Sequence, residues 1–265
     1  MIEKKLKRYK PLKYNKKELT PAHAVKLEYS NSENIKRYLS TKLWDSEEIL
    51  IKRYFKLNGS VLDIGCGAGR TTIAMAKMGF NVTGIDLIPE MIKVSKKQAE
   101  RHNVNVNFMI MDAIKLDFPS ESFDGALFSY NGFENIHDKK NCDSMLEALL
   151  RILRPNGHFI LTARSGLAFN KRSIAWMFMF FRHYLLRPIG LSNPNLKLGD
   201  MIVRGKYHHY HSPFKLRKML QAKGFILEFF NSRSNIQKNK PSTFFTNFST
   251  DNSLFYVAWK PKDNI

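Results

Sequence analysis

Three glycines stand at alternate positions in the segment VLDIGCGAGR, where a short apolar run gives way to a helical pattern. A loop of this kind lets the backbone approach a ligand closely and points the N–H groups of the following helix at it. Gly65, Gly67 and Gly69 have the spacing G-x-G-x-G, and Arg70 stands where a dinucleotide fingerprint has its third glycine. The chain also has no P-loop motif. The pattern therefore indicates a binding loop for a ligand other than NAD or a nucleoside triphosphate.

Two aspartates close the next two apolar segments of the chain. Asp86 lies 21 residues after Gly65, and Asp112 ends the segment NVNFMIMD. A carboxylate at the end of the second strand of such a unit can accept hydrogen bonds from both hydroxyls of a ribose. Either aspartate taken alone is also compatible with an ordinary strand-end residue. Their order and spacing after the glycine loop favour a nucleoside site.

These residues need a scaffold in which strands and helices alternate, and the hydrophobic pattern supplies one. It predicts strands over 61–64, 81–86, 105–112, 123–129 and 158–163, and helices over 70–78, 89–102 and 138–153. A helix over 213–223 and strands over 225–230 and 253–259 follow later in the chain. Alternating elements of this type form a parallel sheet covered by helices on both faces. Ligands of such sheets bind at the carboxyl ends of the strands, where the glycine loop and both aspartates fall.

The motifs together resemble those of the class I S-adenosylmethionine-dependent methyltransferases. The resemblance is carried by VLDIGCGAGR, GIDLIPEMI, MDAIKLDF, FDGALFSYNG and LRILRPNGHFIL, and YHHYHSPFKLRKMLQAKGF resembles the family's C-terminal part. It implies an α/β, Rossmann-like fold with a seven-stranded, mostly parallel sheet and helices on both faces. The last strand is then antiparallel and inserted between the fifth and the sixth. The implied cofactor is S-adenosyl-L-methionine, with Asp86 on its ribose, Asp112 at the adenine amino group and the Ala113 backbone at a ring nitrogen. The full cofactor-binding set that the resemblance implies is Asp63, Gly65, Cys66, Gly67, Gly69, Asp86, Leu87, Asp112, Ala113 and Ser129.

Length and charge divide the chain into a nearly neutral centre and basic flanks. The 265 residues include 43 Lys/Arg and 23 Asp/Glu, a net charge of +20. Residues 58–163 carry eleven basic and twelve acidic residues, whereas residues 164–240 carry fifteen and two. A block this basic attracts RNA, an anionic surface or an acidic substrate, although basic side chains can also be merely solvated. Because only Cys66 and Cys142 are present, with no secretory signal and no transmembrane run, we expect a cytoplasmic protein.

Two parts of the chain fall outside the alternating pattern. We expect residues 1–57 to form a basic tail with capping helices, and residues 58–265 to form the methyltransferase domain with an insertion at 165–206. The insertion contains the run Trp176–Phe181, followed by Arg182 and Arg187. It can be a helix packed on the core, a lid over an apolar acceptor, or a face that contacts RNA or a membrane. We favour the lid, since the family often places its substrate lid after the fifth strand.

The sequence assigns no catalytic residue. The resemblance places residues 129–134 opposite the transferred methyl, so Tyr130 and Glu134 are candidates for contact with the acceptor. The segment lacks the Pro-Pro box of DNA amine methyltransferases and a cysteine for cytosine C5 chemistry. We expect no metal there, since Glu134 is its only acid. The cluster of His208, His209 and His211 can supply a zinc ligand set, a base or a surface strand, and we favour the strand.

The leading hypothesis is a methyltransferase that uses S-adenosylmethionine to methylate an oxygen or nitrogen atom of a small molecule. The basic flanks keep a tRNA-type RNA methyltransferase as the alternative. A third hypothesis is a non-catalytic, cofactor-binding protein associated with nucleic acid. The intact glycine loop and Asp86 speak against a decayed site, although a fold alone does not establish activity. The identity of the acceptor is not encoded in any of these motifs.

Overall fold

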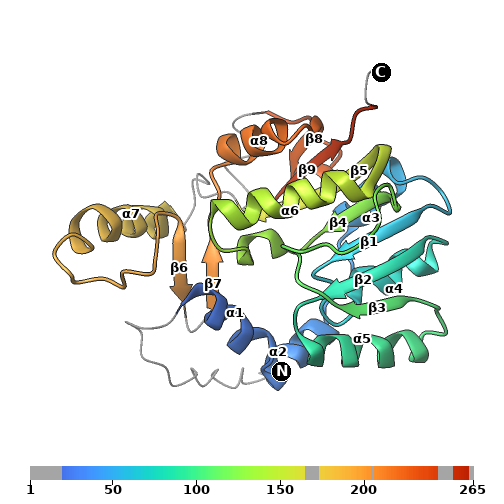
Figure 1. The fold of residues 1–265 in the computed structure, drawn as a ribbon, viewed down its shortest axis with the longest axis horizontal. Helices are drawn as coiled ribbons and strands as arrows, with labels where there is room; N and C mark the ends of the chain where they lie inside the picture. Colours follow the sequence, from blue (N-terminus) through green and yellow to red (C-terminus); the bar gives the residue numbers. More distant parts are fainter. Residues whose placement is uncertain (1–19, 165–172, 204–205, 244–252, 263–265) are drawn as a thin grey trace, which may run out of the picture.

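The computed structural model describes residues 20–164, 173–203, 206–243 and 253–262. Its main sheet has seven strands in the order β3-β2-β1-β4-β5-β9-β8 (Figure 1). Strands β1 to β5 run parallel to one another, whereas β9 is antiparallel to both of its neighbours. This arrangement confirms the predicted Rossmann-like sheet and its inserted antiparallel last strand. The strands are β1 (Ser60–Ile64), β2 (Asn81–Asp86), β3 (Asn107–Ile110), β4 (Phe123–Phe128), β5 (Leu153–Arg164), β8 (Ile226–Ser232) and β9 (Ser253–Trp259).

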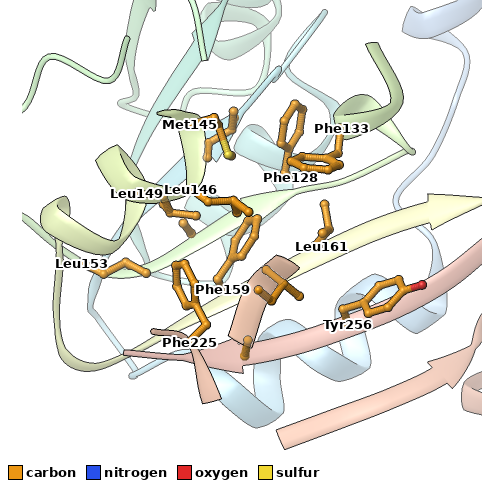
Figure 2. Packing of buried hydrophobic residues seen from close by; sticks show 14 of the residues in the cluster. Phe128, Phe133, Met145, Leu146, Leu149, Leu153, Phe159, Leu161, Phe225 and Tyr256 are labelled. Atoms are coloured by element: carbon orange, nitrogen blue, oxygen red, sulfur yellow. The ribbon is translucent and has the colours of Figure 1, made fainter. Parts of the chain in front are cut away.

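Helices cover both faces of the sheet, as expected from the right-handed crossovers. On one face, α6 (Lys139–Ile152) and α8 (Pro213–Ala222) bury their apolar sides against β4, β5 and β9. Figure 2 shows this layer, in which Leu146 and Leu149 of α6 lie beside Phe159 of β5. On the other face, α3 (Asp45–Tyr54), α4 (Arg70–Lys77) and α9 (Arg233–Gln237) pack on β1, β2, β4 and β9. Helix α5 (Pro89–Arg101) packs beside β3 and α4.

Most predicted strands differ from the structure by one or two residues at an end, and the largest differences are in β3 and β5. Strand β3 ends at Ile110, so Asp112 lies in the following loop and not in the strand, as the predicted range 105–112 had it. Strand β5 begins at Leu153, five residues before the predicted start. The reason is a register shift between Phe123 and Gly125 of β4, which lets the segment around Pro155 and Gly157 continue the strand as an irregular end. Neither change moves the carboxyl end of a strand away from the glycine loop.

The N-terminal region adds three helices to the sheet. They are α1 (Pro21–Tyr29), α2 (Ser32–Leu39) and α3, and all three lie within the stretch 1–57 where capping helices were expected. Asn31 caps α2 because its side-chain oxygen accepts the backbone N–H groups of Glu33 and Asn34. Helix α3 begins after Trp44, whose N–H donates to the Glu47 carboxylate. Each short helix therefore has its own start signal.

The insertion after β5 forms an arm and a hairpin. Helix α7 (Ser173–Phe181) continues into a π-helical turn, Arg182–Leu186, and Figure 1 shows this arm standing out from the rest of the fold. Strands β6 (Asp200–Val203) and β7 (Lys206–His209) then form a separate antiparallel hairpin. His208 and His209 lie on β7, in agreement with the expected strand. No helix in the described part of the chain has the length and apolar character that a membrane span requires.

Candidate active site

A cavity of about 370 Å³ opens at the carboxyl ends of β1, β2 and β4. Nine of the ten residues that the sequence assigned to cofactor binding line it. The exception is Gly69, which caps α4 in a left-handed conformation and packs beside Ile73, Ser95 and Phe108. The remaining walls come from α1, α2, the loop after β4 and the start of α6. The nine predicted lining residues are Asp63, Gly65, Cys66, Gly67, Asp86, Leu87, Asp112, Ala113 and Ser129.

The glycine loop has the backbone that its sequence requires. Gly65 and Gly67 have φ angles of +65° and +54°, in the left-handed region that favours glycine. A Cβ atom at Gly65 would meet the ring of Phe128 at 3.0 Å, whereas one at Gly67 would meet nothing within 4 Å. Gly65 is therefore needed for packing. Gly67 leaves its backbone open to the cavity, which is the approach surface a bound nucleoside would use.

The Asp86 carboxylate, which the resemblance assigns to a ribose, already accepts hydrogen bonds from two backbone N–H groups. One oxygen accepts the Gly67 N–H at 2.9 Å, and the other accepts the Ile88 N–H at 2.9 Å. A carboxylate offers about four acceptor positions, so two remain for the hydroxyls of a ribose. Burial raises the pKa of Asp86, while the backbone N–H groups of Ile88 and Gly67 lower it. Asp86 thus both holds the glycine loop and fits the predicted ligand.

The loops after β2 and β3 form the part of the cavity where the resemblance predicts the adenine. Leu87 is exposed at 38%, and Asp112 and Ala113 line the same space. Asp112 forms a turn in which one carboxylate oxygen accepts the Ile114 N–H at 3.0 Å. This turn fixes the carboxylate beside the cavity. Leu87, Asp112 and Ala113 therefore lie close together, as they would have to if a flat base bound between the two loops.

Asp63 is more deeply placed than its neighbours and serves the scaffold. Its side chain is buried and accepts the hydroxyl protons of Thr71, at 2.6 Å, and Thr72. These threonines begin α4, so the contact fixes the helix N-terminus behind the glycine loop. Burial raises the pKa of Asp63 from 3.8 to about 6, and the two threonine hydroxyls work against that rise. A direct role of Asp63 toward a cofactor remains a prediction.

An ion pair between α3 and α4 was missed by the sequence reasoning. Arg70 and Glu47 form two hydrogen bonds, one of them 2.8 Å from Nη2 to Oε1. Glu47 also accepts the Ser129 hydroxyl and the Trp44 N–H, so its buried carboxylate has four donors. The Arg70 guanidinium lies 5.1 Å from the ring centroid of Tyr130. The network joins the glycine loop to the loop after β4 across the floor of the cavity.

Tyr130 lines the cavity in a strained backbone conformation. Its φ is +55° and that of Asn131 is +61°, which is unusual for residues other than glycine. The Asn131 N–H donates to Thr162 at 2.7 Å, and the Tyr130 ring lies 5.0 Å from Trp44 and 5.9 Å from Tyr38. The surroundings thus hold a turn that presents an aromatic ring to the cavity. Tyr130 therefore lines the cavity, and its contact with an acceptor stays a prediction.

The opposite wall comes from the N-terminal helices. Tyr29 of α1 and Tyr38 of α2 stack with ring centroids 5.6 Å apart, and both line the cavity. The Tyr29 hydroxyl accepts a hydrogen bond from Asn135 at 3.0 Å, and burial raises its pKa well above the usual value. The neutral phenol is therefore the stable form. This wall is placed by contacts with residues far away in the sequence, such as Asn135 and Tyr130, so no local pattern could have revealed it.

A chain of polar groups leads from the cavity into the insertion. His137 lines the cavity, and its Nδ1 lies 3.4 Å from the Tyr207 hydroxyl. The Tyr207 hydroxyl donates to Asp200 Oδ1 at 2.7 Å. Burial alone would raise the pKa of Asp200, but hydrogen bonds from His209, Lys197 and Tyr207 bring it below the usual value. Burial raises the pKa of Tyr207, so Tyr207 keeps its proton and donates it to an ionised Asp200.

The direction of these hydrogen bonds fixes the form of His137. Because the single hydroxyl proton of Tyr207 goes to Asp200, the Tyr207 oxygen can only accept from His137. In the tautomer that donates to Tyr207, the proton of His137 sits on Nδ1 and Nε2 carries the free lone pair. An imidazole oriented in this way is suited to take a proton from a bound molecule.

Comparison with known proteins agrees with this geometry. Residues 61–157 match the model of a family described as a methyltransferase domain. The ubiquinone/menaquinone biosynthesis C-methyltransferase UbiE of Rickettsia massiliae (strain Mtu5) is 30% identical over 173 residues, which cover 62% of this chain and 63% of that protein. A crystal structure of a SAM-dependent methyltransferase from Methanosarcina mazei aligns with a TM-score of 0.65 at 21% identity, covering 84% of this chain and all of the other.

The chain contains a class I S-adenosylmethionine-dependent methyltransferase domain. A further structure with this fold is the 1,6-didemethyltoxoflavin-N1-methyltransferase of Burkholderia thailandensis, which was solved with 1,6-didemethyltoxoflavin and S-adenosylhomocysteine bound. It aligns with a TM-score of 0.59 at 17% identity, over 91% of this chain and 88% of that one. The chain spans less than two thirds of the UbiE relative, and the family model ends at Gly157. Helices α1 and α2 and the insertion lie outside the matched segment.

The described residues of the insertion do not line the cavity, and its role as a lid over the acceptor stays a prediction. None of those within 173–203 or 206–209 lines the cavity of the methyltransferase domain. The β6-β7 hairpin instead supports α1, because Tyr207 packs against Ala24 and Ile202 packs beside them. Trp176 belongs to α7, but its side chain lies outside the described part. The hairpin of the insertion therefore supports the cavity indirectly, because it packs against α1, which forms part of the cavity wall.

Neither Glu134 nor the histidine cluster lines the cavity. Glu134 is fully buried and pairs with Arg164, at 3.1 Å, without lining the cavity. His208 lies 3.9 Å from Glu134, and His209 bonds to Asp200 at 2.7 Å. Burial lowers the pKa of His211 well below its usual value, so its ring stays neutral beside Phe133. Among the described residues, no group of His, Cys, Asp or Glu has the arrangement of a metal site.

Proposed function

We propose that this protein transfers the methyl group of S-adenosylmethionine to an oxygen or nitrogen atom of a small-molecule acceptor. The observation that carries the proposal is one continuous cavity in which nine predicted cofactor residues meet the aromatic wall of α1 and α2. Bound in this cavity, the sulfonium cofactor would supply an activated methyl group. The expected cytoplasmic location is part of the same proposal.

The residues present fit both halves of the donor. Asp86 would bind the ribose with its two remaining acceptor positions, and Asp112 and Ala113 would meet the adenine. Gly67 would let the backbone approach, while Ser129 is fixed by Glu47 at the end of β4. Because methyl transfer is an in-line displacement, alignment and exclusion of water can provide much of the rate. The chain's own contribution is therefore mainly to hold the donor rigidly.

The aromatic wall indicates the class of acceptor. Tyr29, Tyr38, Tyr130 and Phe128 line the space that the donor residues leave. Such walls suit a flat molecule of low polarity. His137 would take the proton from an oxygen or nitrogen nucleophile whose proton must leave. The UbiE relative is named a C-methyltransferase, so a ring carbon is the competing acceptor atom.

The test joins a binding measurement with a turnover measurement. Calorimetry with S-adenosylmethionine, S-adenosylhomocysteine and NAD should show binding of the first two only. Release of S-adenosylhomocysteine should then be measured against pools of phenols, aromatic amines and structured RNA, with mass spectrometry of the product. Turnover with RNA alone, or NAD binding without S-adenosylmethionine binding, would overturn the proposal. A product methylated on carbon would correct only the acceptor atom.

A further inference from the structure

The insertion exposes an unusual concentration of large apolar side chains. Sixteen such residues are exposed in the described part of the chain, and eight of them fall within residues 177–191. We call this segment the apolar arm. It comprises the end of α7, the π-helical turn and the residues up to Leu191, with Met177 exposed at 71% and Leu191 at 68%. The eight residues are Met177, Phe178, Phe180, Phe181, Tyr184, Leu185, Ile189 and Leu191.

The apolar arm has an inner side that holds it and an outer side that presents these residues. Met179 is fully buried although its neighbours on both sides are exposed. The buried Arg182 donates to the Lys197 carbonyl at 3.1 Å, and the rings of Phe180 and Tyr184 lie 4.4 Å apart. Figure 1 shows α7 at the end of the molecule, away from the main sheet. The exposed side chains are thus anchored in place and reach beyond the body of the domain.

The sequence that contains the apolar arm is strongly basic. Residues 165–206 contain seven Lys/Arg and a single acid, Asp200. That acid is buried and bonded to His209 and Tyr207, so it adds no negative charge to the surface. Lys197 is exposed next to the arm, and Arg187 lies within it, bonded to the Pro194 carbonyl at 3.3 Å. The arm therefore combines exposed apolar groups with basic residues.

We propose that the apolar arm docks this protein on the surface of a membrane that contains anionic lipids. Aromatic and aliphatic side chains of such a segment enter the boundary between headgroups and acyl chains, while Lys and Arg pair with the phosphates. RNA would be bound by aromatic stacking, which makes no use of Met177, Leu185, Ile189 and Leu191. A second copy of the chain would bring two basic arms together, which the like charges oppose. An anionic bilayer satisfies both the apolar and the basic residues.

The test is co-flotation of the full chain with vesicles of phosphatidylcholine alone or mixed with phosphatidylglycerol. We expect binding to the mixed vesicles that weakens with added salt. The double change Phe178→Glu with Phe181→Glu should lower partitioning roughly tenfold or more. Lys197→Gln should lower it roughly fivefold. Phe214→Glu is the matched control, because Phe214 is a similarly exposed phenylalanine on α8, outside the arm.

Circular dichroism should show that all variants keep their fold, and light scattering and RNA titration complete the design. Binding of the mixed vesicles by the wild type and by Phe214→Glu, but not by the arm variant, supports the proposal. Vesicle binding that the arm variant retains would overturn it. If the wild type binds no vesicles, the proposal is also overturned. That holds whether the arm variant loses a dimer seen by light scattering, loses RNA binding or behaves as the wild type does. Equal binding to neutral vesicles would contradict the role of anionic lipid.

Discussion

The Arg70 guanidinium and the Glu47 carboxylate form a two-point ion pair away from solvent. Glu47 is fully buried and the Arg70 side chain is only 11% exposed. Position 70 is where a dinucleotide-binding loop has glycine. Arg70, which excludes the dinucleotide fingerprint, therefore has a structural role, since it ties α4 and the glycine loop to the N-terminal helix α3.

Removing one member of this pair should be costly. Arg70→Met would leave the Glu47 carboxylate buried without its cation, and we expect a loss of about 3–5 kcal/mol in the free energy of unfolding. Urea unfolding measures it. The control is Lys139→Met, because the Lys139–Asp143 pair is exposed on α6 and should contribute less than about 1 kcal/mol. Equal losses in the two variants would show that the buried pair is unimportant.

The open backbone of Gly67 can be tested with a matched glycine. Gly67→Ala and Gly190→Ala each place a methyl group in open space at a left-handed φ, so each should cost about 1–2 kcal/mol of stability. Only Gly67 lines the cavity. We therefore expect Gly67→Ala alone to lose affinity for S-adenosylhomocysteine, as measured by calorimetry. Unchanged affinity would remove Gly67 from the cofactor site.

Asp86 should be tested by a change that keeps its shape. Asp86→Asn retains one oxygen for the backbone of the glycine loop but removes the charge that would bind the ribose. We expect weaker binding of S-adenosylhomocysteine by about 1.5–3 kcal/mol. Asp86→Ala would complicate the interpretation, because the backbone N–H groups of Gly67 and Ile88 would also lose their acceptor. Asp117→Asn, at an exposed position outside the cavity, should bind as the wild type does.

Asp63 should make stability depend on pH. Its folded-state pKa of about 6 lies above the usual 3.8, so the folded chain holds this proton more tightly than the unfolded chain. Its contribution favours folding below about pH 4 and declines as the pH rises through about 6, by up to roughly 3 kcal/mol. Wild-type stability should therefore fall relative to Asp63→Asn between about pH 4 and about pH 7. Urea unfolding across that range measures the difference, and a constant offset would contradict it.

His137 should affect turnover without affecting donor binding. With an acceptor found in the release assay, His137→Gln should lower kcat by about 10²–10⁴-fold and leave the affinity for S-adenosylhomocysteine unchanged. Tyr207→Phe should cause a smaller loss, because it keeps the imidazole but removes the hydroxyl that orients it, together with that hydroxyl's hydrogen bond to Asp200. Both losses should shrink at high pH, where the acceptor ionises unaided.

His158→Gln is the control for this series, since His158 pairs with Glu228 on the sheet and lies outside the cavity. A loss in His137→Gln that is independent of pH would assign His137 to packing alone.

The parts of the fold that sequence reasoning predicted are those with local causes. The strand from Asn81 to Asp86 and the last strand from Ser253 to Trp259 have the predicted bounds, because their apolar runs end at clear turn signals. The glycine loop depends on backbone freedom at Gly65 and Gly67, which is also local. The first residue of β5 was misplaced because it depends on a register shift against β4, and no pattern within β5 indicates that shift.

The parts of the site that were missed depend on contacts between distant residues. Glu47 and Arg70 are 23 positions apart, Tyr29 and Asn135 are 106 apart, and His137 and Tyr207 are 70 apart. Glu134 was a candidate for the acceptor contact because it follows Tyr130 closely in sequence. The 3₁₀ turn at Gly132–Asn135 turns it into the core instead, beside Arg164. Side-chain chemistry suggested these residues, but only the folded chain decides where they point.

The wall that Tyr29 and Tyr38 build has a consequence for how this molecule can change over time. The residues predicted to bind the donor lie within the segment 61–157 that the family model matches, whereas α1, α2 and the hairpin behind them lie outside that model. Substitutions in the ends of the chain can therefore reshape the acceptor side while the donor loops stay intact. Two proteins with the same central segment can then modify different compounds. Similarity in that segment therefore predicts a shared methyl donor but not a shared acceptor.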